Sequence, residues 1–141
     1  KKKFLGTLSF YKNKYNDIDI TTEDPLKFAM PEKNWDYGNS DYTQENFFGG
    51  CTAGITGFNV NSAGTITPCA VLLKPIVNIK NKTIKEITQI YTSSKTIGNL
   101  MTKQFNGKCN QCKLKRLCGG CRAVAEGVNN DYLSSDTTCW R

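Results

Sequence analysis

The stretch KCNQCKLKRLCGGCR, from Lys108 to Arg122, places four of the chain's seven cysteines within thirteen residues. A chain does not bury thiols at this density as separate small core side chains, so we expect them to share bonds with a common partner. The cysteines are therefore expected to organise the fold. They are Cys51, Cys69, Cys109, Cys112, Cys118, Cys121 and Cys139.

Cysteine thiolates bind iron–sulfur clusters, bind zinc or form disulfides, and the spacing of the cysteines helps to separate these cases. A disulfide framework is disfavoured because the number of cysteines is odd and the sequence shows no secretory signal. Paired CxxC spacings are also unusual for structural bridges in a secreted domain. Disulfides stay open as an alternative.

A CxxC pair is also the common way to present two sulfurs to one zinc ion, which takes four ligands. Here only Lys113 to Leu117 separate the two pairs, whereas roughly fifteen to twenty residues usually lie between pairs that share one ion. One zinc ion would leave three cysteines unused. Two zinc ions that share the seven sulfurs stay open as an alternative.

Glycine occupies both positions inside the second pair, at Gly119 and Gly120. Glycine lets the backbone pass close to a bulky inorganic group and direct N–H groups toward its sulfides. Cys139 lies well beyond Cys121, and distant ligands that complete a compact run are usual for clusters, because a cluster needs ligands from several directions. These features favour iron–sulfur clusters.

The ordered array resembles the SPASM domain, the C-terminal extension of many radical S-adenosylmethionine enzymes. In that family a cysteine precedes a hairpin that ends in PC, and here GGCTAGITGFNVNSAGTITPC contains Cys51, Gly64 and Cys69. The family then has a CxxC-x5-C run, a close fourth cysteine and a final one, similar to the run from Cys109 and to CGGCRAVAEGVNNDYLSSDTTCW. The resemblance extends from about Gly49 to Trp140.

The resemblance implies two auxiliary [4Fe-4S] clusters. Eight thiolates saturate two such clusters and this chain has seven, so the first cluster is expected to have a non-cysteine ligand, a solvent ligand or an open iron. The family often has three residues in the last gap, where this chain has two, so the exchange of Cys118 and Cys121 between clusters stays open. The implied ligands are Cys51, Cys69 and Cys121 for the first cluster, and Cys109, Cys112, Cys118 and Cys139 for the second.

The CxxxCxxC motif that binds the S-adenosylmethionine-cleaving cluster in this family does not occur in the chain. The chain also begins at Lys1 without methionine. We therefore expect it to be the C-terminal portion of a larger enzyme, in which the radical barrel binds S-adenosylmethionine and a third [4Fe-4S] cluster. A free-standing electron carrier is the alternative, so whether this chain is itself an enzyme stays open.

For the parent enzyme the resemblance implies oxidative modification, with a peptide or protein as the favoured substrate and tetrapyrroles as another class. The clusters are expected to transfer electrons, with a flavodoxin- or ferredoxin-type protein as a partner electron carrier, or to bind a substrate thiolate at an open iron. The reduction potentials of the clusters would depend on their burial, on nearby charge and on hydrogen bonds to their sulfurs. A binding module with purely structural clusters and a zinc-binding interaction domain are the alternatives from other classes.

The net charge is +7, but seven thiolates on two cluster cores of about +2 each would lower it by roughly three units. We therefore expect no nucleic-acid partner, and lysines that are mainly solvated or steer acidic partners. No apolar stretch approaches the roughly twenty residues that span a membrane, so we expect a cytoplasmic protein. With no histidine, the usual proton shuttle is absent, and we predict no catalytic residue.

The expected fold is α+β, a small β-hairpin followed by short helices and cysteine-rich loops around two clusters. Residues 1–48 would be the end of a preceding barrel and a bridging loop, and residues 49–141 the SPASM domain. Within the first part, apolar spacing predicts a helix and alternation near Ile18 and Ile20 predicts a strand. Thr22 to Gly50 is an expected long loop. The apolar face of that helix is predicted to be Phe4, Leu8, Tyr11 and Tyr15.

Within the second part, Gly57 to Cys69 is predicted to be a hairpin that turns between Asn61 and Gly64. A capping box at Thr83 and Glu86 predicts a helix start. We expect a second helix to end at Gly107. The predicted apolar faces of the two helices are Ile84, Ile87, Ile90 and Tyr91, and Ile97, Leu100, Met101 and Phe105.

After the CGGC run, Arg122 to Glu126 is predicted to form a helical turn. Its arginine is expected either to hydrogen-bond a cluster edge or to form a surface salt bridge. Three aspartates, Asp24, Asp131 and Asp136, could act as local acids, but aspartates outside helices more often stabilise turns. We predict turn roles for all three.

Overall fold

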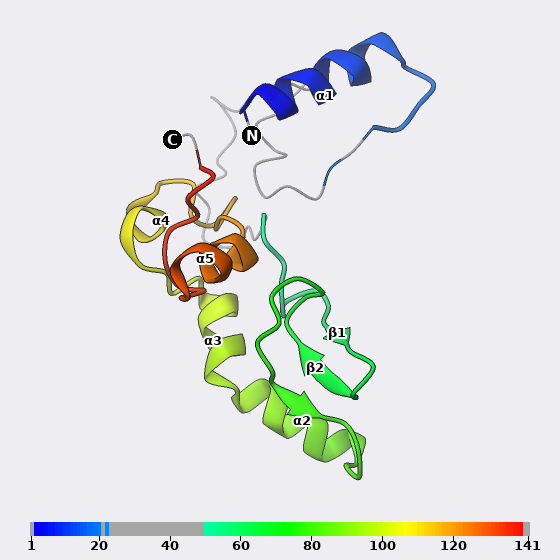
Figure 1. Cartoon of the computed structure of the whole chain (residues 1–141), viewed down its shortest axis with the longest axis vertical. Helices are drawn as coiled ribbons and strands as arrows, with labels where there is room; N and C mark the ends of the chain where they lie inside the picture. The colour runs from blue at the N-terminus through cyan, green and yellow to red at the C-terminus, as the bar shows by residue number, and fades with distance from the viewer. Residues whose placement is uncertain (1, 21, 23–49, 140–141) are drawn as a thin grey trace.

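A computed structural model describes residues 2–20, 22 and 50–139. The predicted long loop, with Asp24 and the aromatic residues around it, lies almost entirely outside the described residues. The order of elements is shown in Figure 1. They are α1 (Lys2–Lys14), β1 (Asn59–Val60), β2 (Thr65–Thr67), β3 (Val77–Asn78), α2 (Ile84–Ser93), α3 (Lys95–Thr102), α4 (Gly107–Gln111) and α5 (Arg122–Asn129).

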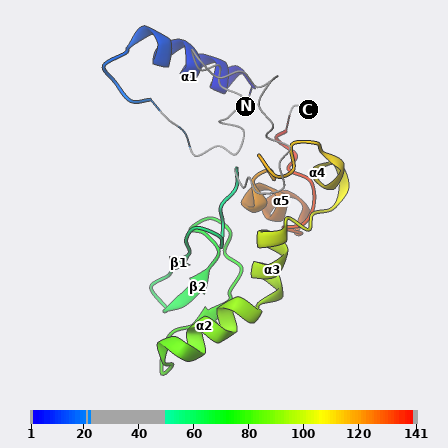
Figure 2. The same ribbon diagram turned by 180° about the vertical axis from the view of Figure 1, so that it is seen from behind.

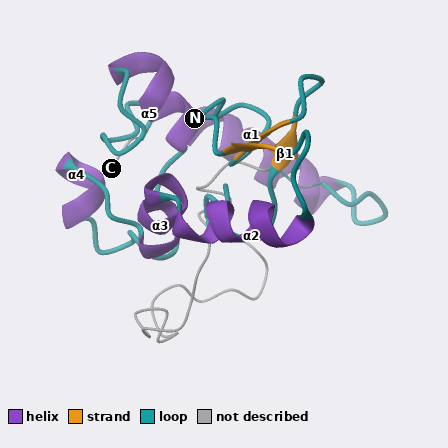
Figure 3. Cartoon of the chain, turned by 90° about the horizontal axis from the view of Figure 1, so that it is seen from below, coloured by secondary structure: helices purple, strands orange, loops and turns teal. Residues whose placement is uncertain are grey.

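The elements are arranged along one long axis. Figures 1 and 2 show α1 at one end, the small sheet and α2 at the other, and α3, α4 and α5 between them. Seen from below in Figure 3, α2 and α3 follow one another beside the sheet. Both elements that flank the CGGC run, α4 and α5, thus lie in the middle of the molecule. Within the described residues, no helix is long and apolar enough to cross a membrane.

The predicted hairpin is confirmed. β1 and β2 pair antiparallel, with Asn59 opposite Thr67. The Asn61 side chain accepts hydrogen bonds from the backbone N–H groups of Ala63 and Thr65, and Gly64 has φ of +81°, a conformation that favours glycine. A third strand, β3, which the sequence analysis did not predict, pairs antiparallel with β2 and completes a sheet of order β1-β2-β3.

The capping box at the start of α2 is confirmed. The Thr83 hydroxyl accepts from the Glu86 backbone N–H at 3.3 Å, and Glu86 Oε2 accepts from the Thr83 backbone N–H at 2.7 Å. The apolar face of α2 is nevertheless much more exposed than predicted. No residue of α2 is buried, and Ile84 is 79% exposed. Tyr91 anchors the helix instead, because its hydroxyl donates to the Gly54 carbonyl at 2.9 Å.

The face predicted for α3 is confirmed in part. Ile97, Leu100 and Phe105 are buried, whereas Met101 is exposed. The predicted stop at Gly107 is wrong, because α3 ends at Thr102 and Lys103 adopts the left-handed conformation that closes it. Gly107 is instead the first residue of α4.

The predicted N-terminal helix is confirmed as α1, but its predicted inward face is confirmed only at Leu8, which is partly buried. Leu5 and Ser9 are buried, while Phe4, Tyr11 and Tyr15 are exposed. Leu5 packs with Cys118, so contact with the cysteine region, rather than local periodicity, decides which side of α1 faces inward. The predicted strand around Ile18 is also wrong, since the described residues after α1 form turns and a bend.

The helix predicted after the CGGC run is confirmed as α5. It is longer than the predicted turn and extends to Asn129, where Asn130 closes it in the left-handed conformation. Its two buried residues are Arg122 and Ala125. The helix therefore begins directly after Cys121 and directs its first side chain into the interior.

Candidate metal centre

Four cysteines line one cavity of about 640 Å³. Cys109 lies on α4 and Cys112 caps its C-terminal end, so the short helix presents two sulfur-bearing residues to the cavity. Gly119, Gly120 and Asp136 also line it. The four cysteines are Cys109, Cys112, Cys118 and Cys139, the set that the sequence resemblance implies for the second cluster.

The sulfurs of this group accept hydrogen bonds from nearby N–H groups. Cys118 Sγ accepts from the Gly120 backbone N–H at 3.2 Å. Cys109 Sγ accepts from the Asp136 backbone N–H at 3.5 Å and from Arg122 Nη2 at 3.6 Å. Hydrogen bonds to cysteine sulfur are among the features that tune a bound cluster.

Burial raises the pKa of the Cys118 thiol to about 11. The Gly120 N–H opposes this shift, whereas the negative charges of Cys139, Cys109 and Asp136 add to it. Without a cation Cys118 therefore keeps its proton at neutral pH. A metal that binds here would have to displace that proton, which couples metal binding to pH.

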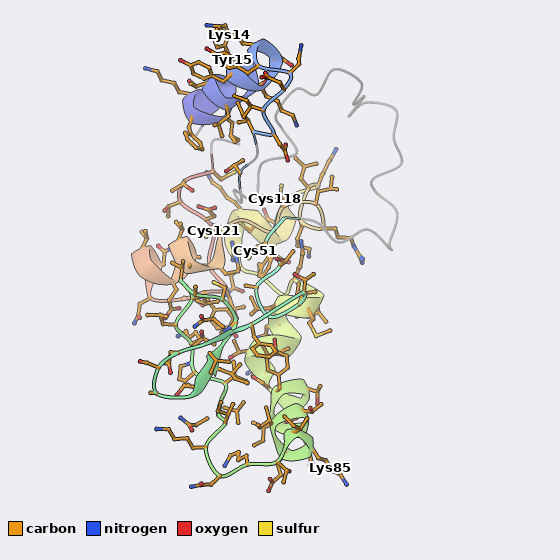
Figure 4. The ribbon with its side chains drawn as sticks, turned by 90° about the vertical axis from the view of Figure 1, so that its right-hand side faces the viewer. Lys14, Tyr15, Cys51, Lys85, Cys118 and Cys121 are labelled. Atoms are coloured by element: carbon orange, nitrogen blue, oxygen red, sulfur yellow. The ribbon has the colours of Figure 1, made fainter. Side chains whose placement is uncertain are left out.

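The remaining three cysteines do not line this cavity. They are Cys51, Cys69 and Cys121. The Cys51 backbone N–H donates to the Cys118 carbonyl at 3.0 Å. At Gly50 (φ +70°) a Cβ atom would lie 1.9 Å from the same carbonyl oxygen, so only glycine permits this approach. Figure 4 shows Cys51, Cys118 and Cys121 in the middle of the molecule, between Lys14 at one end and Lys85 at the other.

The segment that follows Cys69 packs against the segment that follows Cys121. Cys69 Sγ accepts from the Leu72 backbone N–H at 3.1 Å. Two residues further on, Lys74 pairs with Glu126 of α5 at 2.7 Å and lies over the Tyr132 ring. The ion pair is partly exposed, with 36% of the Lys74 side chain and 23% of the Glu126 side chain accessible.

All seven cysteines lie in the described residues and all are free thiols, so the structure contains none of the disulfides that the sequence left open. Over residues 2–20, 22 and 50–139, no three histidine, cysteine, aspartate or glutamate side chains lie close enough to hold one metal ion. The four cysteines around the cavity are spread about its wall. Their role as ligands, and that of the other three, stays a prediction.

Arg122 is completely buried, so the alternative of a surface salt bridge is wrong. Its Nη1 donates to the carbonyls of Tyr132 and Ser134 at 3.0 and 2.7 Å, and its guanidinium stacks 4.2 Å from the centre of the Phe105 ring. Together with the bond to Cys109, these contacts fix the terminal loop against α5.

Lys103 is a second buried cation, 2% exposed. Its Nζ donates to the Arg116 carbonyl at 2.7 Å. Burial lowers the pKa of Lys103 to about 8, while the thiolate charges of Cys51 and Cys118 act in the opposite direction. Lys103 was not predicted from the sequence, because nothing in its local pattern distinguishes it from the exposed lysines.

Two of the predicted turn aspartates are described. Asp131 Oδ1 accepts from the Leu133 backbone N–H at 2.9 Å, as a turn residue does. Asp136 Oδ1 accepts from the Thr138 backbone N–H at 2.8 Å, but Asp136 is also buried and its Oδ2 accepts from Cys121 N–H at 2.8 Å. Asp136 thus belongs to the cysteine region as well as to a turn.

The chain is similar over part of its length to curated proteins named AdoMet-dependent heme synthase. It is 35% identical over 92 residues to that of Methanosarcina barkeri and 32% identical over 92 residues to that of Nitratidesulfovibrio vulgaris. The matches cover 64% of this chain but only 25% and 24% of those proteins. The chain thus spans about a quarter of the length of these relatives. No family model and no solved structure matches it.

Proposed function

We propose that this chain is the C-terminal auxiliary-cluster part, of the SPASM type, of a radical S-adenosylmethionine enzyme, and that it binds two [4Fe-4S] clusters. The observation that carries the proposal is the cavity lined by Cys109, Cys112, Cys118 and Cys139. Its volume of about 640 Å³ leaves room for a group larger than a single ion. The four cysteines supply the thiolates that such a cluster requires.

The surroundings of these cysteines support the same assignment. Clusters are tuned by hydrogen bonds to their sulfurs, by net charge and by solvent exposure. Here backbone N–H groups reach Cys109 and Cys118. Leu5 of α1 packs with Cys118, and Leu8 and Cys139 pack against this pair. The chain would therefore hold the second cluster with donors on one side and apolar cover on another.

For the first cluster we propose Cys51, Cys69 and Cys121 as ligands, with one iron left for a non-cysteine ligand, solvent or substrate. The placement of Cys118 on the cavity supports the assignment of Cys118, rather than Cys121, to the second cluster. The Cys121 N–H is held by Asp136, and the segments after Cys69 and Cys121 are joined through Lys74 and Glu126. The ion pair supports a shared region for Cys69 and Cys121, and the bond to Asp136 places Cys121 next to the second set.

When bound, the clusters would supply one-electron transfer, and the open iron would supply a binding position for a substrate thiolate. The residues of this chain would position the thiolates, exclude water and set the local charge. We propose a flavodoxin- or ferredoxin-type protein as the electron carrier and the radical barrel of the parent chain as the main intramolecular partner. We propose a cytoplasmic location, because reducing compartments keep cysteines available as cluster ligands.

The parent enzyme would bind S-adenosylmethionine and a third [4Fe-4S] cluster in its barrel. A peptide or protein substrate is the proposal from the sequence resemblance. The names of the relatives favour a second candidate, modification of a tetrapyrrole. Incubation of the full-length parent with S-adenosylmethionine, a reductant and each substrate class, followed by mass spectrometry of the products, separates these two candidates.

Metal and sulfide analysis of the chain after anaerobic purification tests the cluster proposal. Two full clusters require roughly eight irons and eight acid-labile sulfides per chain. Brown protein with this composition supports the proposal. Colourless protein with about two zinc ions and no sulfide overturns it and supports a zinc-binding interaction domain. Clusters that show no accessible redox couple would indicate a binding module with purely structural clusters.

A further inference from the structure

The two glycines of the CGGC run have a buried cation beside each of them. Gly119 and Gly120 adopt φ of +69° and +64°. A Cβ atom on Gly119 would lie 3.3 Å from Lys103 Nζ, and one on Gly120 would lie 2.6 Å from Arg122 Nη2. Because these two residues lack side chains, the Lys103 ammonium fits beside Gly119 and the Arg122 guanidinium fits beside Gly120.

The two cations come from different elements. Lys103 closes α3, and its ammonium reaches the Arg116 carbonyl, close in sequence to Cys118. Arg122 opens α5 and reaches Cys109 Sγ together with two carbonyls of the terminal loop. Both therefore lie at the cysteine run and are locked by hydrogen bonds to main-chain oxygens.

Burial of charge is costly unless opposite charge lies nearby. Among the described residues, the buried charged side chains are two cations, Lys103 and Arg122, and one carboxylate, Asp136. Once a cluster is bound, the thiolates of Cys109 and Cys118 would place negative charge close to these two cations.

We propose that Lys103 and Arg122 are a built-in counter-charge for the cysteine sites, and that they raise the reduction potentials of the clusters bound there. The inference rests on the proposed function. A [4Fe-4S] core of about +2 with four thiolates has a net charge of about −2, and one-electron reduction adds a further negative charge. Nearby fixed cations stabilise the reduced state more than the oxidised state, particularly where water is excluded.

The two cations should differ in which clusters they affect. Arg122 donates to Cys109, so its charge should act mainly on the second cluster. Lys103 lies against Gly119, and its ammonium interacts electrostatically with both Cys51 and Cys118. Its charge should therefore act on both clusters.

The test is a redox titration, followed by electron paramagnetic resonance, of the anaerobically loaded wild-type chain and two neutral variants, Lys103→Met and Arg122→Met. We expect each variant to favour the oxidised state about tenfold more, which equals about 59 mV for a one-electron couple. Arg122→Met should shift one couple, and Lys103→Met should shift both. The matched control is Lys85→Met, which removes an exposed charge on α2 far from the cysteines.

The outcomes separate the inference from the proposed function. If the wild-type protein contains no iron and no sulfide, both the inference and the proposed function are wrong. If all variants load fully but the reduction potentials shift no more in the neutral variants than in Lys85→Met, the inference alone is overturned. If the neutral variants do not load, Lys103→Arg and Arg122→Lys decide. Full loading of these two supports a requirement for charge, whereas their failure shows a requirement for side-chain shape and overturns the inference.

Discussion

The backbone N–H of Cys121 donates to Oδ2 of Asp136 at 2.8 Å. The other carboxylate oxygen accepts from the Thr138 backbone N–H and hydroxyl at 2.8 and 2.6 Å. One buried carboxylate therefore connects the end of the CGGC run to the segment that leads to Cys139. The same side chain therefore holds Cys121 of the first set and Thr138, the neighbour of Cys139 of the second set.

Asp136→Ala is expected to destabilise the folded chain by about 1–3 kcal/mol, because it leaves the buried N–H of Cys121 without this acceptor. Denaturant unfolding of the anaerobically loaded protein, followed by cluster absorbance, measures the change. Asp131→Ala is the matched control, since it removes a turn aspartate with one backbone bond. Equal losses in both variants would contradict the special role of Asp136.

Gly120→Ala is expected to destabilise the chain by about 2–5 kcal/mol, because a Cβ atom at φ of +64° would meet both Arg122 Nη2 and Asp136 Cβ, at 2.6 and 2.7 Å. Gly127→Ala is the control, since Gly127 lies in α5 with nothing within 4 Å of the added atom. That change should be neutral or stabilise by up to about 1 kcal/mol. Thermal unfolding of both variants gives the comparison.

Cys112→Ser and Cys69→Ser are expected to affect different clusters. If the proposed sets are correct, each variant loses up to half of the iron and sulfide, roughly four atoms of each, and retains the spectrum of the other cluster. Mössbauer or electron paramagnetic resonance spectra of the two variants should therefore add up to that of the wild type. Loss of the same signal in both variants would show that Cys69 and Cys112 bind one cluster.

Thr83→Ala is expected to cost about 1 kcal/mol of stability in α2, because it removes the hydroxyl that accepts from the Glu86 N–H. Hydrogen exchange of the α2 amides should accelerate, while iron and sulfide content stays at the wild-type level, since Figure 4 shows Lys85 of this helix far from the labelled cysteines. Accelerated exchange at α5 as well would contradict this local effect.

The same capping box predicts a pH dependence. Hydrogen bonds from the backbone N–H and hydroxyl of Thr83 lower the pKa of Glu86 below its ordinary value. The folded state therefore favours the carboxylate, and the stability that it contributes is present above the unfolded pKa and is lost as pH falls through the folded pKa. Helicity of α2 should decrease in mild acid in the wild type. In Glu86→Gln this decrease should be absent.

The local elements were predictable where the signal is short in range. The turn from Asn61 to Gly64 and the capping box at Thr83 each depend on residues a few positions apart, and both are confirmed. β3 was missed because two residues, Val77 and Asn78, offer no periodic pattern. The inward face of α1 was predicted only in part, because Leu5 is selected by contact with Cys118, which is far away in sequence.

The candidate site was likewise predictable only in part. The family resemblance implied a four-cysteine set, and the structure brings those residues around one cavity. The buried cations were not predictable as a pair. Arg122 can be singled out from the sequence because it directly follows Cys121. Lys103 can be singled out only from the structure, in which it closes α3 in the left-handed conformation and its ammonium donates to the Arg116 carbonyl. Such a contact depends on tertiary packing.

The contact between Lys74 and Glu126 has a consequence for handling the protein. This partly exposed ion pair helps to join the segments after Cys69 and Cys121, and dissolved salt screens such pairs. The contacts of Arg122 and Cys118 are buried and much less open to screening. Concentrated buffers should therefore loosen the first set of cysteines before the second, so the choice of purification medium will influence which cluster survives.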